Sequence, residues 1–133
     1  MCNSNNERGV AIVEFAIILP VLLLLVFGII QFGFIFNGQI TLTSAVREGA
    51  RFAVVGNNEG DVKDKVIKSS TALLLKVLED DIDVIEIKED GNVIQKKVSA
   101  KGTVDIIMPF LDFFIKNPVE LTAESIMRNE KTF

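Results

Sequence analysis

Residues 9–36 read GVAIVEFAIILPVLLLLVFGIIQFGFIF, a nearly continuous apolar run with one charged side chain, Glu14. From Phe15 to Phe36 the run carries no charge, and Gln31 is its one amide side chain. A helix needs about 20 apolar residues to cross the roughly 30 Å hydrocarbon core of a bilayer. Because the run is apolar on every face, it predicts a membrane-spanning helix and not an amphipathic helix lying on a surface.

Two polar or helix-bending residues inside this run need explanation. A charged side chain at mid-membrane costs about 2.5–3.5 kcal/mol on insertion scales, so Glu14 is a candidate functional residue. The alternative is that Glu14, near the start of the segment, simply reaches the lipid headgroups. Pro20 removes one helical hydrogen bond and predicts a kink about a third of the way along the segment.

The composition bounds the rest of the chain. It has 133 residues, 49% of them hydrophobic, and a formal net charge of −4. We expect a polar leader at residues 1–9, a transmembrane helix at residues 10–36 and one small domain at residues 37–133. The mildly acidic balance argues against nucleic acid as a partner. With no histidine and one cysteine, Cys2, the sequence gives little support to a metal site, a His-based triad or a bound cofactor.

After Phe36 the pattern changes to that of an amphipathic helix that continues out of the membrane to Val54, with Gly56 as its stop. Its expected buried face contains Leu42, Ala45, Val46, Gly49, Ala50 and Ala53. Arg47, Glu48 and Arg51 lie away from that face or at its edge. The spacing of Glu48 and Arg51 predicts an ion pair within the helix. Contact with lipid headgroups, the packed sheet or another subunit is the alternative.

The remaining residues predict one more helix and about four strands. Apolar residues recur at three- and four-residue steps through residues 62–78, which predicts a second, half-buried helix. Ile82 to Lys88, a turn at 89–92 and a strand beginning at Val93 form a hairpin signal. Alternation then predicts a long strand through residues 98–108, with Gly102 as a bulge, and a last strand from Val119 to Met127. The apolar stretch Phe110 to Ile115 is expected to cover the core, or else to form an exposed patch. This order favours an α+β fold, with helices against one face of an antiparallel sheet.

Three stretches resemble a known family: the junction from Gly9 to Phe15 with the helix that follows, SAVREGAR at residues 44–51, and LTAESIMRNE at residues 121–130. The chain resembles the TadE-like family of pseudopilins, which belongs to Flp/Tad type IV pilus-like assemblies. The resemblance implies a pilin-like fold, with the N-terminus in the cytoplasm and the domain outside it. It also implies a structural protein, not an enzyme, whose partners are the membrane, a prepilin peptidase and other pilins or pseudopilins.

The resemblance places peptidase cleavage between Gly9 and Val10, with Glu14 and Phe15 as recognition and assembly residues. Cleavage creates an amine on Val10 that is mostly protonated at neutral pH. Glu14 lies about one turn, or roughly 6 Å along the axis, from that amine. The pair can form within one subunit. In pilin-like assemblies, the corresponding glutamate is thought to meet the amine of a neighbouring subunit.

Three other interpretations compete with a cleaved pseudopilin. The first is an uncleaved single-pass anchor for an accessory or sensor module. The second is a secreted protein with a signal peptide cut near Thr43-Ser44-Ala45, although its apolar region is longer than the usual 7–15 residues. The third is a hydrolase that uses two carboxylates, but no catalytic pair stands out among the scattered acids.

Overall fold

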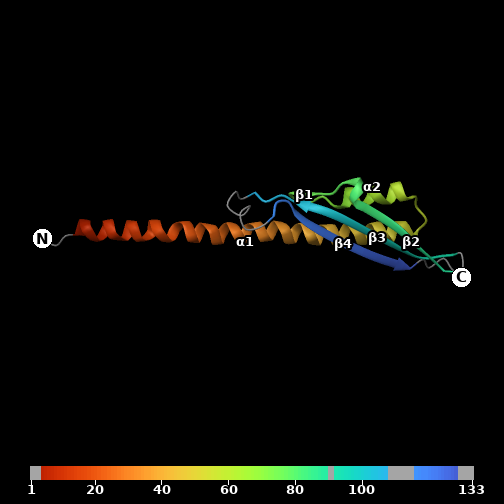
Figure 1. Cartoon of the computed structure of the whole chain (residues 1–133), viewed down its shortest axis with the longest axis horizontal. Coiled ribbons are helices and arrows are strands. Elements are labelled where there is room, and N and C mark those ends of the chain that lie inside the picture. Colours follow the sequence, from red (N-terminus) through yellow and green to blue (C-terminus); the bar gives the residue numbers. More distant parts are fainter. Residues whose placement is uncertain (1–3, 90–91, 108–115, 129–133) are drawn as a thin grey trace.

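One long helix lies along a small α+β domain in the computed structural model, which describes residues 4–89, 92–107 and 116–128 (Figure 1). The helices are α1 (Ser4–Val54) and α2 (Glu59–Ser69). They are followed by strand β1 (Leu75–Lys76), the 3₁₀ turn η1 (Glu79–Asp81), and strands β2 (Ile82–Glu89), β3 (Asn92–Val104) and β4 (Val119–Arg128). The predicted α+β class is therefore confirmed.

Helix α1 is continuous from the apolar run into the domain, as predicted. It starts at Ser4, within the expected polar leader at residues 1–9, and so earlier than the expected Val10. It ends where Gly56 adopts a positive φ of 103°, a conformation that glycine reaches without steric cost. The side-chain amide of Asn57 donates to the Phe52 carbonyl at 2.8 Å and satisfies one of the last helical acceptors.

The sheet is antiparallel and is organised around its longest strand, β3. Strand β4 pairs with β3 from Val104↔Val119 to Gln95↔Arg128. On the other side of β3 lie β2 and, further along, β1. The predicted hairpin is confirmed as β2 and β3, with an irregularity in the register between Ile87 and Lys88.

The second helix is much shorter than predicted. It ends at Ser69, where the Ser70 hydroxyl donates to the Ile67 carbonyl at 2.9 Å. The Thr71 hydroxyl donates in the same way to the Lys68 carbonyl. Such side chains offer the backbone an alternative to the helical ladder, so the three- and four-residue spacing beyond them does not continue the helix. The chain instead turns at Leu74, which has a positive φ of 68°, and enters β1.

Gly102 does not form the predicted bulge. It sits in regular register opposite Leu121. A Cβ at this position would lie 2.9 Å from Cδ1 of Leu75 and 3.2 Å from Cγ2 of Val77. The glycine therefore serves close packing of the β1 segment against β3, where the sequence suggested an irregular backbone.

Helices α1 and α2 cover one face of the sheet (Figure 1). The predicted buried face of α1 is confirmed, and its residues form one core with the inward side chains of the strands. Inward alternation along β4 is also confirmed. The buried apolar core contains Leu42, Ala45, Val46, Ala50, Ala53, Val62, Val66, Ile82, Val98, Ala100, Val104, Leu121 and Ala123.

Gly49 sets how closely the two helices approach, and this can be tested. A Cβ at Gly49 would overlap Cγ2 of Val66, a β-branched side chain with little rotamer freedom. We expect Gly49→Ala to lower the unfolding free energy, because overpacking costs about 1–3 kcal/mol while the gain in helix propensity is about 0.5–1 kcal/mol. Calorimetric melting of the full chain in detergent measures the change.

Gly60→Ala is the matched control, because α2 leaves nothing within 4 Å of a Cβ at Gly60. It should be neutral or slightly stabilising. Equal effects of the two substitutions would contradict the role given to Gly49.

Candidate functional site

The N-terminal half of α1 is bare apart from neighbouring turns of the same helix. The large apolar side chains from Val10 to Ile30 that the structure exposes include Val10 at 66%, Phe15 at 60% and Ile17 at 70%. The most apolar window of this helix has no residue buried inside the protein. By length and composition it is a candidate membrane span, as the sequence predicted.

The predicted processing residues lie together on this bare half. Gly9, Val10, Val13, Glu14 and Ile17 line one shallow, open hollow along the helix. Val10 and Glu14 are four residues apart, so they share a helix face. No lysine or arginine occurs between Gly9 and Val46, so the apolar segment itself supplies no cation for the Glu14 carboxylate.

Pro20 lies inside α1, which continues past it without a break. The ribbon shows no interruption at this part of the helix (Figure 1). The kink that the sequence predicts at Pro20 stays a prediction.

The bare half ends at Gln31, which is buried to 2% exposure. Its Oε1 accepts a hydrogen bond from the Ile107 backbone amide at 3.1 Å. Its Nε2 donates to the Asp105 carbonyl at 3.4 Å. Both halves of the amide therefore bind the segment that follows β3, and the domain covers α1 six residues before the predicted boundary at residue 37.

The apolar pattern predicted Gln31 to lie in the membrane-spanning run, and its contact with the domain was not predicted. A signal was available, because the steps from Gln31 to Ile35, Gly38 and Leu42 are four, three and four residues. This spacing extends the buried face of α1 backwards to Gln31. A second amide repeats the arrangement in a more exposed place, where Nε2 of Gln39 donates to the Thr122 carbonyl of β4 at 3.0 Å.

The three charged residues of the SAVREGAR stretch do not form the predicted intrahelical pair. Glu48 instead bridges to α2, with its Oε1 2.8 Å from Lys65 Nζ and its Oε2 accepting from the Ser69 hydroxyl at 2.8 Å. These contacts, the Lys65 hydrogen bond foremost, lower the pKa of Glu48. The prediction was wrong because a lysine on the neighbouring helix reaches the carboxylate. Arg47 and Arg51 are exposed and form no ion pair with a described carboxylate.

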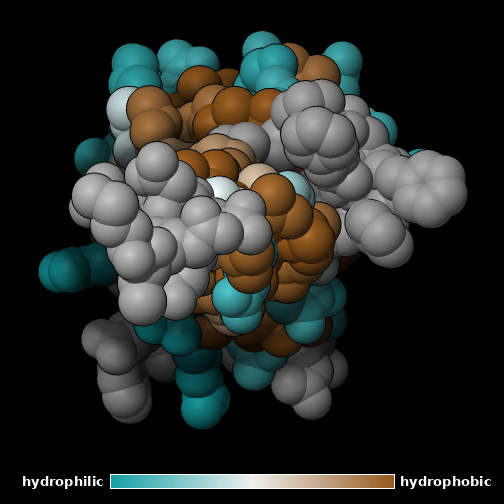
Figure 2. Space-filling view, turned by 90° about the vertical axis from the view of Figure 1, so that its left-hand side faces the viewer, coloured by the Kyte–Doolittle hydropathy of each residue, from teal (hydrophilic) through white to brown (hydrophobic). Residues whose placement is uncertain are grey.

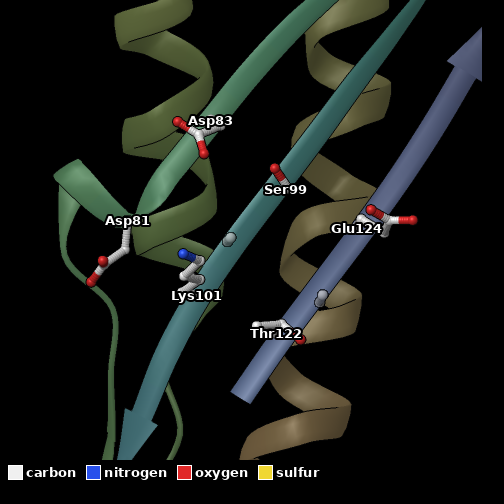
Figure 3. Close-up of a pocket in the computed structure, with 8 residues that line it drawn as sticks. Asp81, Asp83, Ser99, Lys101, Thr122 and Glu124 are labelled. Atoms are coloured by element: carbon white, nitrogen blue, oxygen red, sulfur yellow. The ribbon is translucent and has the colours of Figure 1, made fainter. Parts of the chain in front are cut away.

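A shallow hollow of about 250 Å³ lies on the outer face of the sheet. Figure 3 shows its acidic side chains on different elements, with Asp83 on β2 and Glu124 on β4. Glu124 is paired with Lys97 at 2.6 Å. Among the described residues, no group of three His, Cys, Asp or Glu side chains is arranged to hold a metal ion. The hollow therefore offers no converged set of acid, base or nucleophile.

The stretch Phe110 to Ile115 lies within residues 108–115, which are outside the described residues. Its expected role as core cover or exposed patch stays a prediction.

These features define a class of protein: a single long helix, half bare and apolar, half packed against a small α+β domain. Residues 9–51 match the model of the TadE-like protein family. The match supports a TadE-like family assignment, as the sequence resemblance predicted, and the family is a structural, pilus-associated one. The matched segment lies wholly within α1. Residues 121–130, which also resemble the family, are therefore outside the match. Searches of curated proteins and of solved structures gave no match.

The Gln31 contact predicts that Gln31 contributes more to the unfolding free energy than Gln39, the other glutamine of α1 that binds the domain. Gln31→Met keeps the side-chain volume but leaves the Ile107 amide without its acceptor. We expect a loss of about 1–3 kcal/mol in unfolding free energy, the usual penalty for a buried group deprived of its partner. Hydrogen exchange at Ile107 should also become faster.

Gln39→Met is the matched control. Water can replace its exposed bond to Thr122, so the loss should be smaller. The role given to Gln31 fails if both variants lose the same stability, measured by calorimetry and by exchange at Ile107.

The Glu48 contacts predict a pH-dependent link between α1 and α2. Because the pKa of Glu48 is lowered in the folded state, its ionised form stabilises the fold at pH values above about 4.3, the ordinary value for glutamate. That contribution is lost as the pH falls through the lowered folded-state pKa. Glu48→Gln should therefore reduce the melting temperature at neutral pH and converge with the unsubstituted protein in acid.

Glu120→Gln, on an exposed position of β4, controls for the removal of one negative charge. A difference between Glu48→Gln and the unsubstituted protein that is constant at all pH values would exclude the ionised contact as its cause.

Proposed function

We propose that this chain is a minor pseudopilin of a Tad-type, type IV pilus-like assembly. A prepilin peptidase cuts it between Gly9 and Val10, and the remainder enters or supports the assembly as a structural subunit. The observation that carries the proposal is the bare apolar half of α1, with Glu14 one turn from the cleavage bond, inside the segment that matches the TadE-like model.

The cleavage bond lies in a helix, whereas a protease cleft takes up an extended backbone. Gly9 lowers the cost of local unwinding, because glycine in a helix is about 0.5–1 kcal/mol less favourable than alanine. No atom lies within 4 Å of a Cβ built at Gly9, so a larger side chain there leaves the packing of α1 unchanged. Substitution of Gly9 therefore tests access by the peptidase separately from folding.

Cleavage supplies the partner that Glu14 needs. The new amine on Val10 is a cation one helical turn away on the same face, or at the same level on an adjacent subunit. Where water is scarce, the attraction between the two charges is stronger than at a surface, and an unpaired carboxylate is penalised. The pair thus favours an axial register in which each Glu14 meets an amine.

The domain half of α1 also keeps an uncovered face. Phe36 and Ile40 are 65% and 66% exposed, and Arg47 and Arg51 are exposed about two and three turns beyond Ile40. This stripe lies opposite the face that packs on the sheet. Its apolar and cationic residues suit contact with another subunit, the role that the resemblance implies for Arg47 and Arg51.

The test compares three variants in a strain that contains the peptidase. Intact mass of membrane-extracted protein should show loss of residues 1–9 in the unsubstituted chain. Gly9→Val should leave an uncut precursor. Glu14→Ala should be cut but should be absent from the assembled fraction, because its carboxylate no longer pairs with the amine.

Ile12→Ala, an exposed position two residues before Glu14 that does not line the hollow, is the control and should be both cut and assembled. An intact leader in the unsubstituted chain would favour the uncleaved membrane anchor. Normal assembly of Glu14→Ala would remove the pairing role from Glu14, whatever the cleavage result.

A further inference from the structure

Gln31 marks the residue at which the lipid-facing segment of α1 ends on the side of the domain. Val10 to Ile30 is 21 residues, or about 31 Å of helix, which matches the roughly 30 Å hydrocarbon core. Gln31 follows at once and is satisfied by protein backbone, not by water. The domain therefore begins directly at the end of a segment of bilayer length, with no spacer between them.

The end of the domain at this level carries exposed apolar side chains. Strand β3 runs toward Gln31, since Asp105 and Ile107 follow its last residue, Val104. Strand β1 is antiparallel to β3, with Leu75 opposite Val104, so Leu73, just before β1, lies at the same end. Leu73 is 66% exposed and Ile107 is 48% exposed.

Charged groups accompany these two residues. Lys76 pairs with Asp105 at 2.6 Å, and Lys116 is exposed where the chain returns toward β4. We call Leu73, Lys76, Asp105, Ile107 and Lys116 the rim. Figure 2 looks along α1 from its N-terminal side and shows hydrophobic side chains gathered in the middle of this face, with hydrophilic ones at the periphery.

We propose that the rim rests on the bilayer surface, with Leu73 and Ile107 inserted at the boundary between headgroups and acyl chains. The occupant is lipid because the backbone amide of Ile107 binds Gln31, the residue at which the apolar spanning segment ends, and Leu73 lies at the same end of the sheet. Exposed apolar side chains beside lysines are the combination that the interface accepts, since the apolar groups leave water and the ammonium groups stay with anionic headgroups. The inference rests on the membrane anchorage of the proposed function, and not on cleavage or assembly.

Seating of this kind would hold the domain against the membrane before any partner is bound. The uncovered face of α1, with Phe36 and Ile40, would then point away from the sheet and its rim, where another subunit can reach it. A protein partner on the rim is the competing occupant, and it differs from lipid in requiring a second component.

The experiment places a nitroxide spin label at single positions of the full, uncut chain in a Cys2→Ser background. The chain is reconstituted in vesicles of phosphatidylethanolamine and phosphatidylglycerol with no other protein. Leu73→Cys and Ile107→Cys report on the rim, and Leu24→Cys reports on the spanning segment. The measurement is the ratio of relaxation by oxygen, which enriches in lipid, to relaxation by a water-soluble nickel chelate.

The chain supplies matched controls for exposure. Leu78 is 65% exposed, like Leu73, but follows β1 and so lies further from Gln31. Ile126 is 52% exposed, like Ile107, and lies opposite Lys97, toward the far end of the sheet. We expect the ratio at Leu73→Cys and Ile107→Cys to be several-fold higher than at Leu78→Cys and Ile126→Cys.

Equal, water-like ratios at all four domain positions, with a lipid-like ratio at Leu24→Cys, would overturn the seating while leaving the anchor intact. That result would also favour a protein partner for the rim. A water-like ratio at Leu24→Cys would overturn both the seating and the membrane anchorage. Failure of cleavage or of pilus assembly in the strain would change none of these ratios.

Discussion

Helix α1 is exposed and apolar along its first half and packed against the domain along its second half. The side-chain amide of Gln31 lies at the boundary between the two halves. Before it, α1 presents apolar side chains in all directions, and nothing in the described part of the chain covers them. After it, one face of α1 is buried against β3 and β4. A polar amide is tolerated at this junction because protein backbone satisfies both its donor and its acceptor.

The domain can approach the helix this closely because small residues form its buried face. Ala45, Gly49, Ala50 and Ala53 leave room for the β-branched side chains of α2 and the sheet, such as Val66 and Val98. Larger residues there would increase the apolar area, but they would hold the layers apart. The domain outside the apolar run is small, so its core is small too. Close packing against this one face of α1 therefore has to supply much of its stability.

The sequence predicted most of the architecture, because the signals were long and periodic. The apolar run, the buried face of α1 and the alternation along β4 are each repeated over several turns or residues. Predictions based on one or two residues were less secure. The end of α2 depended on hydroxyl groups that compete with the helix, and the role of Gly102 depended on the unexpected approach of Leu75. Contacts between elements, such as Glu48 with Lys65, have no signature along the chain.

Two glutamates on α1 illustrate how the candidate site differs from the rest of the fold. Glu48 lies in the domain half, where α2 supplies a lysine and a hydroxyl, so its charge is compensated within the chain. Glu14 lies in a stretch from Gly9 to Val46 that contains no cation at all. In the proposed assembly, a cation from outside this segment compensates the charge of the Glu14 carboxylate. In the proposed mechanism, cutting after Gly9 both removes Arg8 and creates the Val10 amine, so the compensating charge becomes available only when the subunit is ready to assemble.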